Sequence, residues 1–503
     1  MRVTHRRRRL PVVFAAVALT AGCTASQAAP AKELPTIVTT TTPAPAAQPA
    51  PEPVALHPSA PRQSPGVIAA GKRDAPYNYA PTLLLDGGRY RMWWCSQLGI
   101  ANPPGDDILL SESKSIHGPF TGPDGSAATP VFSGSGGKFD AMHTCDPSVI
   151  KVGGTYYLYY TGAAGDHAHG NGIGLATSPD GRVWTRANGG NPLVTASRNV
   201  SRANTYGAGQ PAALHVAGSF YLMFTDTTGQ ASGHNGAGQF VLRSPDPAFG
   251  RDVEALTENG FEAVDDTSSR ERSVVDAFSA DWMWVDALAA FAIAHETRDG
   301  TTITFWDWDF RSTPYQPLLV PGPWREGPGL VRRADGHAPP AVDNPCGKVP
   351  IDLVRATWEA PAGPSNLMHF GLDVGGFDAC ADPGRAVMAL NGFAMPSPQR
   401  TIDLVVGGQV VRIERRSVAE RLALRILDER LPVLDQLEVA AHIGPRVQAR
   451  EAPGRGVAFV VDDRLWPVGS AEVASLNSSD PRPMTVAEWD DYERGVDLFG
   501  PPR

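Results

Sequence analysis

One stretch of sixteen residues, Asp146–Thr161, recurs along this chain and constrains its fold more than any other feature. It has the pattern of a strand, a tight turn at Gly153-Gly154 and a second, tyrosine-rich strand. The proline after Asp146 indicates the start of a strand, because proline has no N–H to donate to a neighbouring strand. Similar stretches begin at Ala80 and at Gln210.

Two weaker copies follow. The copy at Asp281 keeps the length but lacks the proline and the glycines, and the copy at Glu326 is recognisable only in its first strand. A third strand follows each of the first three hairpins. Antiparallel units repeated about every 65 residues are typical of propeller blades. The sequence therefore predicts an all-β, five-bladed β-propeller over residues 72–396.

The N-terminus has the features of an export signal. Four arginines, Arg6 to Arg9, precede an apolar run from Leu10 to Leu19, and small residues then lead to Cys23. This pattern resembles a bacterial lipoprotein signal peptide over residues 1–23. It implies a lipid on Cys23 and a place on the outer face of the cytoplasmic membrane. The alternative is an ordinary cleaved signal with an incidental cysteine.

Residues 24–71 consist mostly of Ala, Pro, Thr and Gln, which predicts a disordered tether. At the other end, residues 397–503 predict a small α+β appendage. Thr401–Ile413 has the pattern of a hairpin turning at Gly407-Gly408, and Ser417–Leu431 has apolar residues at helical spacing. Alternatively, some of these strands complete the fifth blade.

Four further cysteines suggest two disulfides in an exported protein. Cys95 ends the second strand of the first blade, and Cys145 precedes the first strand of the second blade on the same face of the ring. This register favours Cys95 with Cys145, and it leaves Cys346 with Cys380. Buried, unpaired thiols are the alternative.

Composition and missing motifs narrow the function. A net charge of −9 argues against a nucleic-acid or anionic-membrane surface as partner. The sequence has no phosphate loop, dinucleotide fingerprint, nucleophilic serine motif or spaced zinc ligands. His167 and His169 could ligate a metal, but a solvated loop is the simpler interpretation. We expect a monomer without a cofactor or metal.

In a propeller the first strand of each blade lines a central channel, so the residues that open the copies meet at one mouth. These are Ala80, Asp146, Gln210, Asp281 and Glu326, with Tyr77, Asn78, Tyr79, His143, Tyr206 and Trp282 beside them. Carboxylates accept hydrogen bonds from hydroxyl groups, and aromatic faces pack against sugar rings. The pattern predicts a pocket for a polysaccharide or oligosaccharide.

The motifs Cys145–Ile150, Gly154–Thr161 and Ala176–Trp184 resemble the five-bladed glycosidases of glycoside hydrolase family 43 and the related invertase-like families. The resemblance implies a base or nucleophile Asp at the opening of the first blade, a helper Asp in the second and an acid Glu in the third. Asp146 matches the helper. Ala80 and Gln210 depart from the pattern, whereas Glu326-Gly327-Pro328 carries the acid motif in the fifth copy.

The expected mechanism is hydrolysis between two carboxyl groups. Glu326 is the expected acid, Asp281 or Asp74 activates water or attacks, and Asp146 tunes and orients. For each of these acids the alternative is a structural cap or a solvated side chain. The expected substrate-binding residues are Asn78, Tyr79, His143, Gln210 and Trp282.

By resemblance, the substrate is an arabinose- or xylose-containing polysaccharide, and a calcium ion lies in the channel of some relatives. One alternative function is a glycan-binding lipoprotein that has lost catalysis. Another is a platform for docking other proteins.

Overall fold

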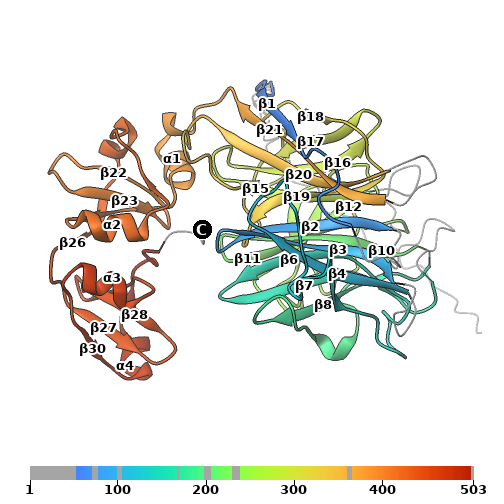
Figure 1. Ribbon diagram of the computed structural model, residues 1–503, viewed down its shortest axis with the longest axis horizontal. Coiled ribbons are helices and arrows are strands. Elements are labelled where there is room, and N and C mark those ends of the chain that lie inside the picture. Colours follow the sequence, from blue (N-terminus) through green and yellow to red (C-terminus); the bar gives the residue numbers. More distant parts are fainter. Residues whose placement is uncertain are drawn as a thin grey trace, which may run out of the picture. The chain divides into compact units, whose positions relative to one another are not determined.

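The structure, a computed structural model, describes residues 52–70, 77–98, 105–166, 169–197, 206–228, 238–358 and 365–499. Cys23 and Asp74 lie outside these ranges. The described chain is mostly antiparallel β-sheet, and its short α-helices all follow Asp382 (Figure 1). Among the described residues, no helix combines the length and apolar character needed to cross a membrane.

The copies of the repeat fold as groups of antiparallel strands. The first and fifth groups join in one eight-stranded sheet, and the other three groups form sheets of their own. The first group is β2 (Asn78–Asp86), β3 (Arg89–Leu98), β4 (Gly105–Ser113) and β5 (Thr129–Phe132), and the second is β6 (His143–Val152), β7 (Thr155–Ala163), β8 (Gly172–Ser178) and β9 (Thr185–Arg186). The third is β10 (Ala208–Val216), β11 (Ser219–Asp226), β12 (Gln239–Ser244), β13 (Glu254–Thr257) and β14 (Gly260–Ala263). The fourth is β15 (Ala280–Val285), β16 (Ala290–Thr297), β17 (Gly300–Trp306) and β18 (Leu318–Pro321).

The predicted glycine turns join the first two strands where the repeat is strongest. Gly153 and Gly154 adopt φ of 57° and 85°, and Gly87 and Gly88 adopt φ of 60° and 73°. A side chain is disfavoured in this region, so glycine suits both turn positions.

A fifth group consists of β19 (Glu326–Arg333), β20 (Val349–Trp358), β21 (Ser365–Gly375) and β1 (His57–Gln63). Here the structure differs from the expected tether, because residues 57–63 pair with β21. An edge strand needs backbone pairing more than buried side chains, so it tolerates Pro58 and Pro61. Arg62 also forms ion pairs with Asp352 and Asp373.

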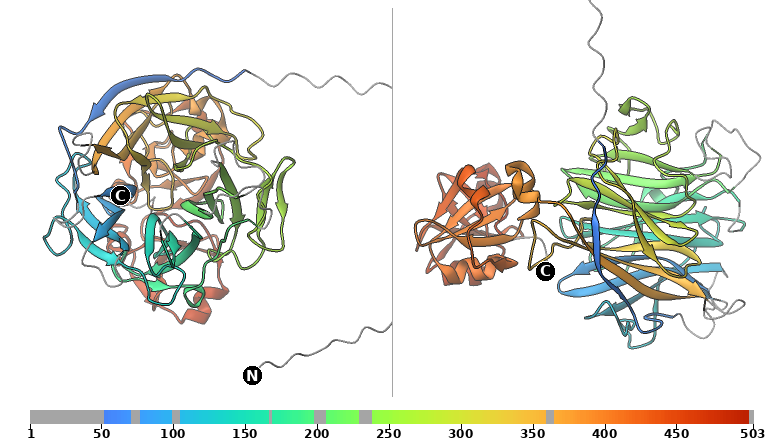
Figure 2. Two further views of the ribbon diagram at one scale, coloured as in Figure 1. Left: turned by 90° about the vertical axis from the view of Figure 1, so that its right-hand side faces the viewer. Right: turned by 90° about the horizontal axis from the view of Figure 1, so that it is seen from above.

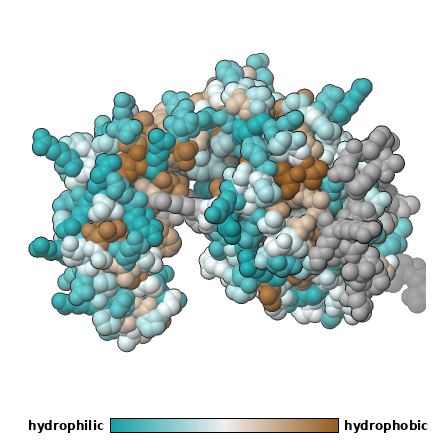
Figure 3. Space-filling view, viewed as in Figure 1, coloured by the Kyte–Doolittle hydropathy of each residue, from teal (hydrophilic) through white to brown (hydrophobic). Residues whose placement is uncertain are grey.

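The first strands of the groups form a closed ring. β2 lies against β6, β6 against β10, β10 against β15 and β15 against β19, and β19 pairs in parallel with β2. The groups therefore surround a common centre (Figure 2). Large side chains such as Trp282 and Phe291 fill the space between neighbouring groups. On the face shown in Figure 3, apolar residues form small patches among hydrophilic ones.

A turn after β19 crosses the far end of this ring. The carbonyl oxygens of Ala334, Asp335 and Gly336 accept hydrogen bonds from the backbone N–H groups of Lys151, His215 and Trp284, respectively. These three donors lie at the distal ends of β6, β10 and β15. The turn therefore connects three inner strands that are far apart in sequence.

His337 holds this turn and should make stability depend on pH. Its Nδ1 lies 3.0 Å from Asp286 and its Nε2 lies 3.2 Å from the His215 carbonyl, so both nitrogens face acceptors. Burial lowers the pKa of His337, but the charges of Asp286 and Asp335 outweigh burial and the repulsion from Arg333, and the net pKa is raised. The contribution of His337 to stability is present below its unfolded pKa and is lost as pH rises through the folded pKa.

We expect the melting temperature to fall as pH rises from about 6 to about 8.5, and we expect His337→Gln to have a lower melting temperature at pH 6 with a flatter decline. Differential scanning calorimetry of both proteins across this range checks the effect. Parallel curves for the two proteins would contradict it.

The C-terminal part contains two sheets with the same strand order and directions. The first has β22 (Phe393–Pro396), β23 (Ile402–Val406), β24 (Gln409–Ile413), β25 (Arg425–Ile426) and β26 (Val439–Ile443), and the second has β27 (Ala449–Ala452), β28 (Gly456–Val461), β29 (Arg464–Pro467), β30 (Pro481–Pro483) and β31 (Glu493–Arg494). In each, a three-stranded meander is followed by a helix, and two short strands then pair in parallel with its edges. The chain therefore carries a second, tandem duplication.

Four short helices, α1 (Pro383–Ala389), α2 (Arg416–Leu422), α3 (Ala471–Leu476) and α4 (Val486–Asp491), accompany these sheets. The hairpin expected at Gly407-Gly408 forms between β23 and β24. The α2 helix stops at Leu422, earlier than its apolar spacing predicted, because Ile426 belongs to the strand β25. Phe393–Pro396 also pairs with β23, so this part begins before residue 397.

Candidate active site

Four of the five inner strands break their register at the same point near their start. The residues at this bulge are Ala80, Asp146, Gln210 and Gly327, with φ of 46°, 48°, 54° and 49°, and each precedes a proline. A bulge redirects a side chain, and a positive φ strains any residue other than glycine. The fourth inner strand, β15, keeps a continuous register from Ala280, in line with its missing proline.

Glu326 precedes the bulge of β19 and lies in a pocket of about 240 Å³ together with Tyr77, Tyr79, Gln97, Asp106 and Arg325. Burial and the negative charge of Asp146 raise the pKa of Glu326 to about 7, although Arg325 and a hydrogen bond with Gln210 act in the opposite direction. At neutral pH this carboxyl group therefore holds a proton for a large part of the time, as a general acid requires.

Asp146 is 4% exposed. Neither oxygen of its carboxylate has a hydrogen-bond partner of normal geometry among the described residues. Burial raises the pKa of Asp146, and the charge of His143 partly offsets this effect. A buried carboxylate without a well-formed hydrogen bond costs stability, which favours a functional role for this side chain.

Asp106, at the start of β4, was missed in the sequence analysis. Its Oδ2 lies 2.6 Å from Nδ1 of His143. Burial lowers the pKa of His143, but the hydrogen bond to Asp106 and the charge of Asp146 outweigh burial and raise it. Asp106 supplies a carboxylate in the first strand group, where Ala80 takes the position of the expected Asp. The sequence did contain a signal for this residue, because Asp106-Asp107 lie at the start of a third strand, and that strand begins at the channel mouth.

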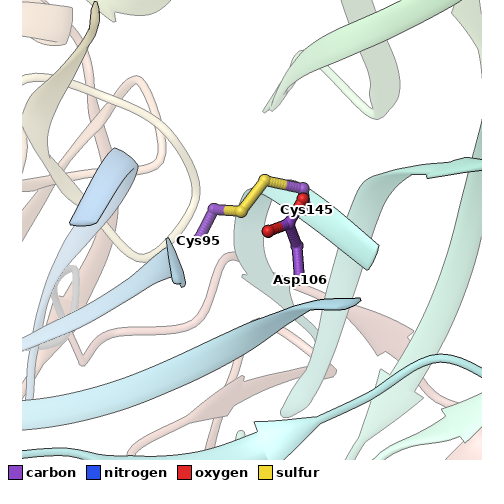
Figure 4. A group of neighbouring side chains, drawn as sticks. All are labelled: Cys95, Asp106 and Cys145. Carbon is purple, nitrogen blue, oxygen red and sulfur yellow. A yellow bond between two sulfur atoms is a disulfide. The ribbon is translucent and has the colours of Figure 1, made fainter. Parts of the chain in front are cut away.

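Both predicted disulfides are confirmed, Cys95 with Cys145 and Cys346 with Cys380. The first lies beside Asp106 (Figure 4), and the hydroxyl of Tyr79 is 3.1 Å from Sγ of Cys145. The two sulfurs and the Asp106 carboxylate are close enough for a metal site, but sulfur in a disulfide is not a thiolate ligand. This cluster therefore does not fit a metal ion.

Asp281 is engaged in an ion pair, which makes a role as base or nucleophile unsuitable. One carboxylate oxygen lies 3.1 Å from Nη1 of Arg332, and the other accepts a hydrogen bond from the N–H of Leu330. Burial raises the pKa of Asp281, and Arg332 opposes this effect. These contacts favour a structural role for Asp281 in closing the ring over the predicted catalytic one.

Arg332 is fully buried and also donates to the carbonyl oxygens of Ala213 and Trp282 and to Oγ1 of Thr82. These groups belong to three different inner strands, so the guanidinium group of Arg332 supplies a positive charge in the channel between them. A calcium ion does not fit beside it, because the two positive charges would repel.

Two predicted substrate-binding residues are structural. Trp282 is fully buried, its ring stacks on Phe291, and its Nε1 donates to the Ala212 carbonyl. Asn78 is 1% exposed and is bonded to Ser365, Asn366, Trp94 and Ser96. Both were expected to line the pocket because they lie next to the mouth residues in sequence, but their side chains point into the packing between strands.

The remaining predicted substrate-binding residues lie at the mouth of the ring. Gln210 accepts a hydrogen bond from Ser279 and lies beside Glu326. Burial raises the pKa of Tyr79, and the charges of Asp106, Asp146 and Glu326 raise it further. In the loop of paired histidines, His169 forms an exposed ion pair with Asp166, and His167 lies outside the described residues.

A second pocket of about 380 Å³ is also lined by Arg325 and Glu326. Phe278, Trp324 and Glu296 line it. Burial raises the pKa of Glu296 to about 7, although Arg355 and a hydrogen bond from Thr301 oppose this shift. Glu326 therefore borders two adjoining pockets.

No protein-family model and no curated protein matches the sequence. Among solved structures, the chain is similar to a family 117 glycoside hydrolase from the marine bacterium Zobellia galactanivorans, with 14% identity, a TM-score of 0.42, and coverage of 64% of this chain and 92% of that one. It is also similar to an α-L-arabinofuranosidase from Podospora anserina solved with cellotriose (14% identity, TM-score 0.39, coverage 63% and 97%). A family 62 α-L-arabinofuranosidase from Coprinopsis cinerea is comparable (13% identity, TM-score 0.40, coverage 64% and 98%). Similarity at this level does not assign an activity, and the resemblance to family 43 stays a prediction.

Proposed function

We propose that this chain is a glycoside hydrolase whose five strand groups form a five-bladed propeller with the active site at the mouth of the ring. The observation that carries the proposal is the pairing of Glu326, a glutamate with its pKa raised to about 7, with the carboxylate of Asp106 in one pocket. Glycoside hydrolysis needs one protonated and one ionised carboxyl group beside the scissile bond.

In this mechanism Glu326 donates its proton to the leaving oxygen of the glycosidic bond. Asp106, held by His143, is the second carboxylate, which either accepts a proton from the attacking water or attacks the sugar itself. Burial keeps Glu326 protonated by raising its pKa, and the negative charge of Asp146 adds to this effect. Gln210 and Tyr79 are placed to hold substrate hydroxyl groups.

The substrate class and the location follow from the sequence motifs. We propose an arabinose- or xylose-containing polysaccharide as substrate. We further propose that a monomer is exported and held on the outer face of the cytoplasmic membrane by a lipid on Cys23.

The pH dependence of turnover tests the proposal. If Glu326 is the acid, kcat/KM falls about tenfold per pH unit above about pH 7, because the required proton is lost. The substrate is whichever arabinan, xylan or fructan oligosaccharide the protein hydrolyses. Reducing-sugar release between about pH 5 and about pH 9 measures this limb. The control is Glu258→Gln, which changes an exposed glutamate between β13 and β14. Binding without turnover on every polysaccharide tested would instead favour the glycan-binding alternative.

A further inference from the structure

Arg325, the residue before the proposed acid, has an unused guanidinium group. Its backbone N–H donates to the Ala356 carbonyl at 2.8 Å. Its Nη1 atom is buried but has no hydrogen-bond partner in the described part of the chain. Within the same residues, no carboxylate forms an ion pair with it within 4.0 Å. A buried donor without an acceptor is costly, so a partner is expected from outside the chain.

Other arginines buried in the ring have ion-pair or hydrogen-bond partners, although the Nε atoms of Arg332 and Arg355 have none among the described residues. Arg332 bonds Asp281, Arg270 bonds Asp226, and Arg355 donates to Thr301 and to two carbonyl oxygens. Arg325 differs from them because it lines both pockets beside Glu326. Arg325 therefore borders the space where a substrate would lie.

Two aromatic rings fix the position of this guanidinium group. Its Cζ atom lies 3.7 Å from the ring centroid of Trp358 and 4.9 Å from that of Tyr77. Trp358, at the end of β20, and Tyr77, just before β2, both form backbone pairs with Ser365 of β21. This arrangement brings the two rings to the same cation. Cation–π contacts hold an arginine in place without using its N–H donors.

The two rings also remain accessible, with Trp358 43% and Tyr77 40% exposed. Exposed aromatic faces are suited to packing against sugar rings. The site therefore combines a fixed, unpaired guanidinium group with an aromatic platform, next to the carboxyl group that would cleave the bond.

We propose that Arg325 binds the carboxylate of an acidic sugar, so that the preferred substrate carries a uronic acid at or next to the bond cleaved. A planar guanidinium group matches a planar carboxylate through two parallel hydrogen bonds. The charges in the site allow this binding, because Asp106 is paired with His143 and Asp146 is buried. This inference rests on the proposed hydrolase and specifies its substrate.

Matched ligands test the inference. Oligosaccharides from glucuronoxylan and from polygalacturonate are compared with their carboxyl-reduced forms, which differ only in that charge. Isothermal titration calorimetry on the full-length Glu326→Gln protein measures binding, and reducing-sugar release by the wild-type protein measures turnover. We expect at least one uronate ligand to bind tenfold or more tightly than its reduced form.

Three variants in the Glu326→Gln background then locate the effect. Arg325→Gln should abolish the preference, and Trp358→Leu should weaken it by releasing the guanidinium group without removing it. Arg251→Gln, which alters an exposed arginine paired only with its neighbour Asp252, should leave it unchanged. Melting temperatures confirm that each variant is folded, and Trp358→Leu keeps the inference testable if Arg325→Gln does not fold.

The outcomes separate this inference from the proposed function. Equal binding of the two ligand forms, or a preference that persists in Arg325→Gln, overturns the inference. Neutral oligosaccharides that are hydrolysed as fast as acidic ones leave the hydrolase proposal standing and overturn only the acidic substrate. A preference for sulfated over carboxylated oligosaccharides overturns the inference that Arg325 binds a carboxylate. Neither binding nor hydrolysis of any oligosaccharide overturns both proposals.

Discussion

Changing Glu326 to glutamine is expected to lower kcat on a natural oligosaccharide by about 10²- to 10⁴-fold, the usual contribution of a general acid. Glutamine has the shape of the protonated glutamate but cannot give up a proton. Burial and the charge of Asp146 raise the pKa of Glu326 to about 7, so its side chain is already uncharged for much of the time at neutral pH. This substitution should therefore disturb the fold very little.

The choice of leaving group makes this test specific. An aryl glycoside with a strongly acidic phenol needs little protonation, so its hydrolysis by Glu326→Gln should be far less impaired than that of the natural substrate. Glu258→Gln should behave as wild type on both substrates, since its side chain is exposed. An equal loss of activity on both substrates would assign Glu326 a role in binding.

Asparagine at Asp146 and at Asp281 should have opposite consequences. Asp146→Asn should reduce kcat/KM by about 10²-fold or more, as expected for a group that acts on the acid and on the substrate, and it should leave stability unchanged or higher. The substitution removes a buried charge without a hydrogen-bond partner, and asparagine tolerates the φ of 48° at this position.

Asp281→Asn should instead lower the free energy of unfolding by about 3–5 kcal/mol, because it leaves Arg332 buried without its counter-charge. Urea denaturation followed by tryptophan fluorescence measures the stability of both variants, and sugar release measures their activity. A stable but inactive Asp281→Asn protein would restore Asp281 as a catalytic candidate.

The parts of the fold predicted from sequence depend on local chemistry. Gly153-Gly154 and the proline after Asp146 act within a few residues, so the hairpins and their copies are visible without any tertiary information. The pairing of Cys95 with Cys145 followed from the same register, because both lie at the mouth end of adjacent first and second strands.

The features that sequence reasoning missed depend on distant partners. Asp281 and Asp146 occupy equivalent places in the repeat, and the ion pair of Asp281 with Arg332, contributed by the last strand group, could not be read from the sequence. The clamp around Arg325 joins Trp358 and Tyr77, which lie at opposite ends of the ring's sequence. The strand at residues 57–63 escaped notice because it is stabilised by the edge of β21 and contains no apolar pattern of its own.

The turn at Ala334–Gly336 closes the far end of the ring, and Arg332 fills the channel above it. A polymer cannot thread through such a ring, so a glycan can approach the carboxyl groups from one face only. In the proposed hydrolase, a released sugar must leave through the opening by which the substrate enters. Accumulated product and fresh substrate would therefore compete for this opening.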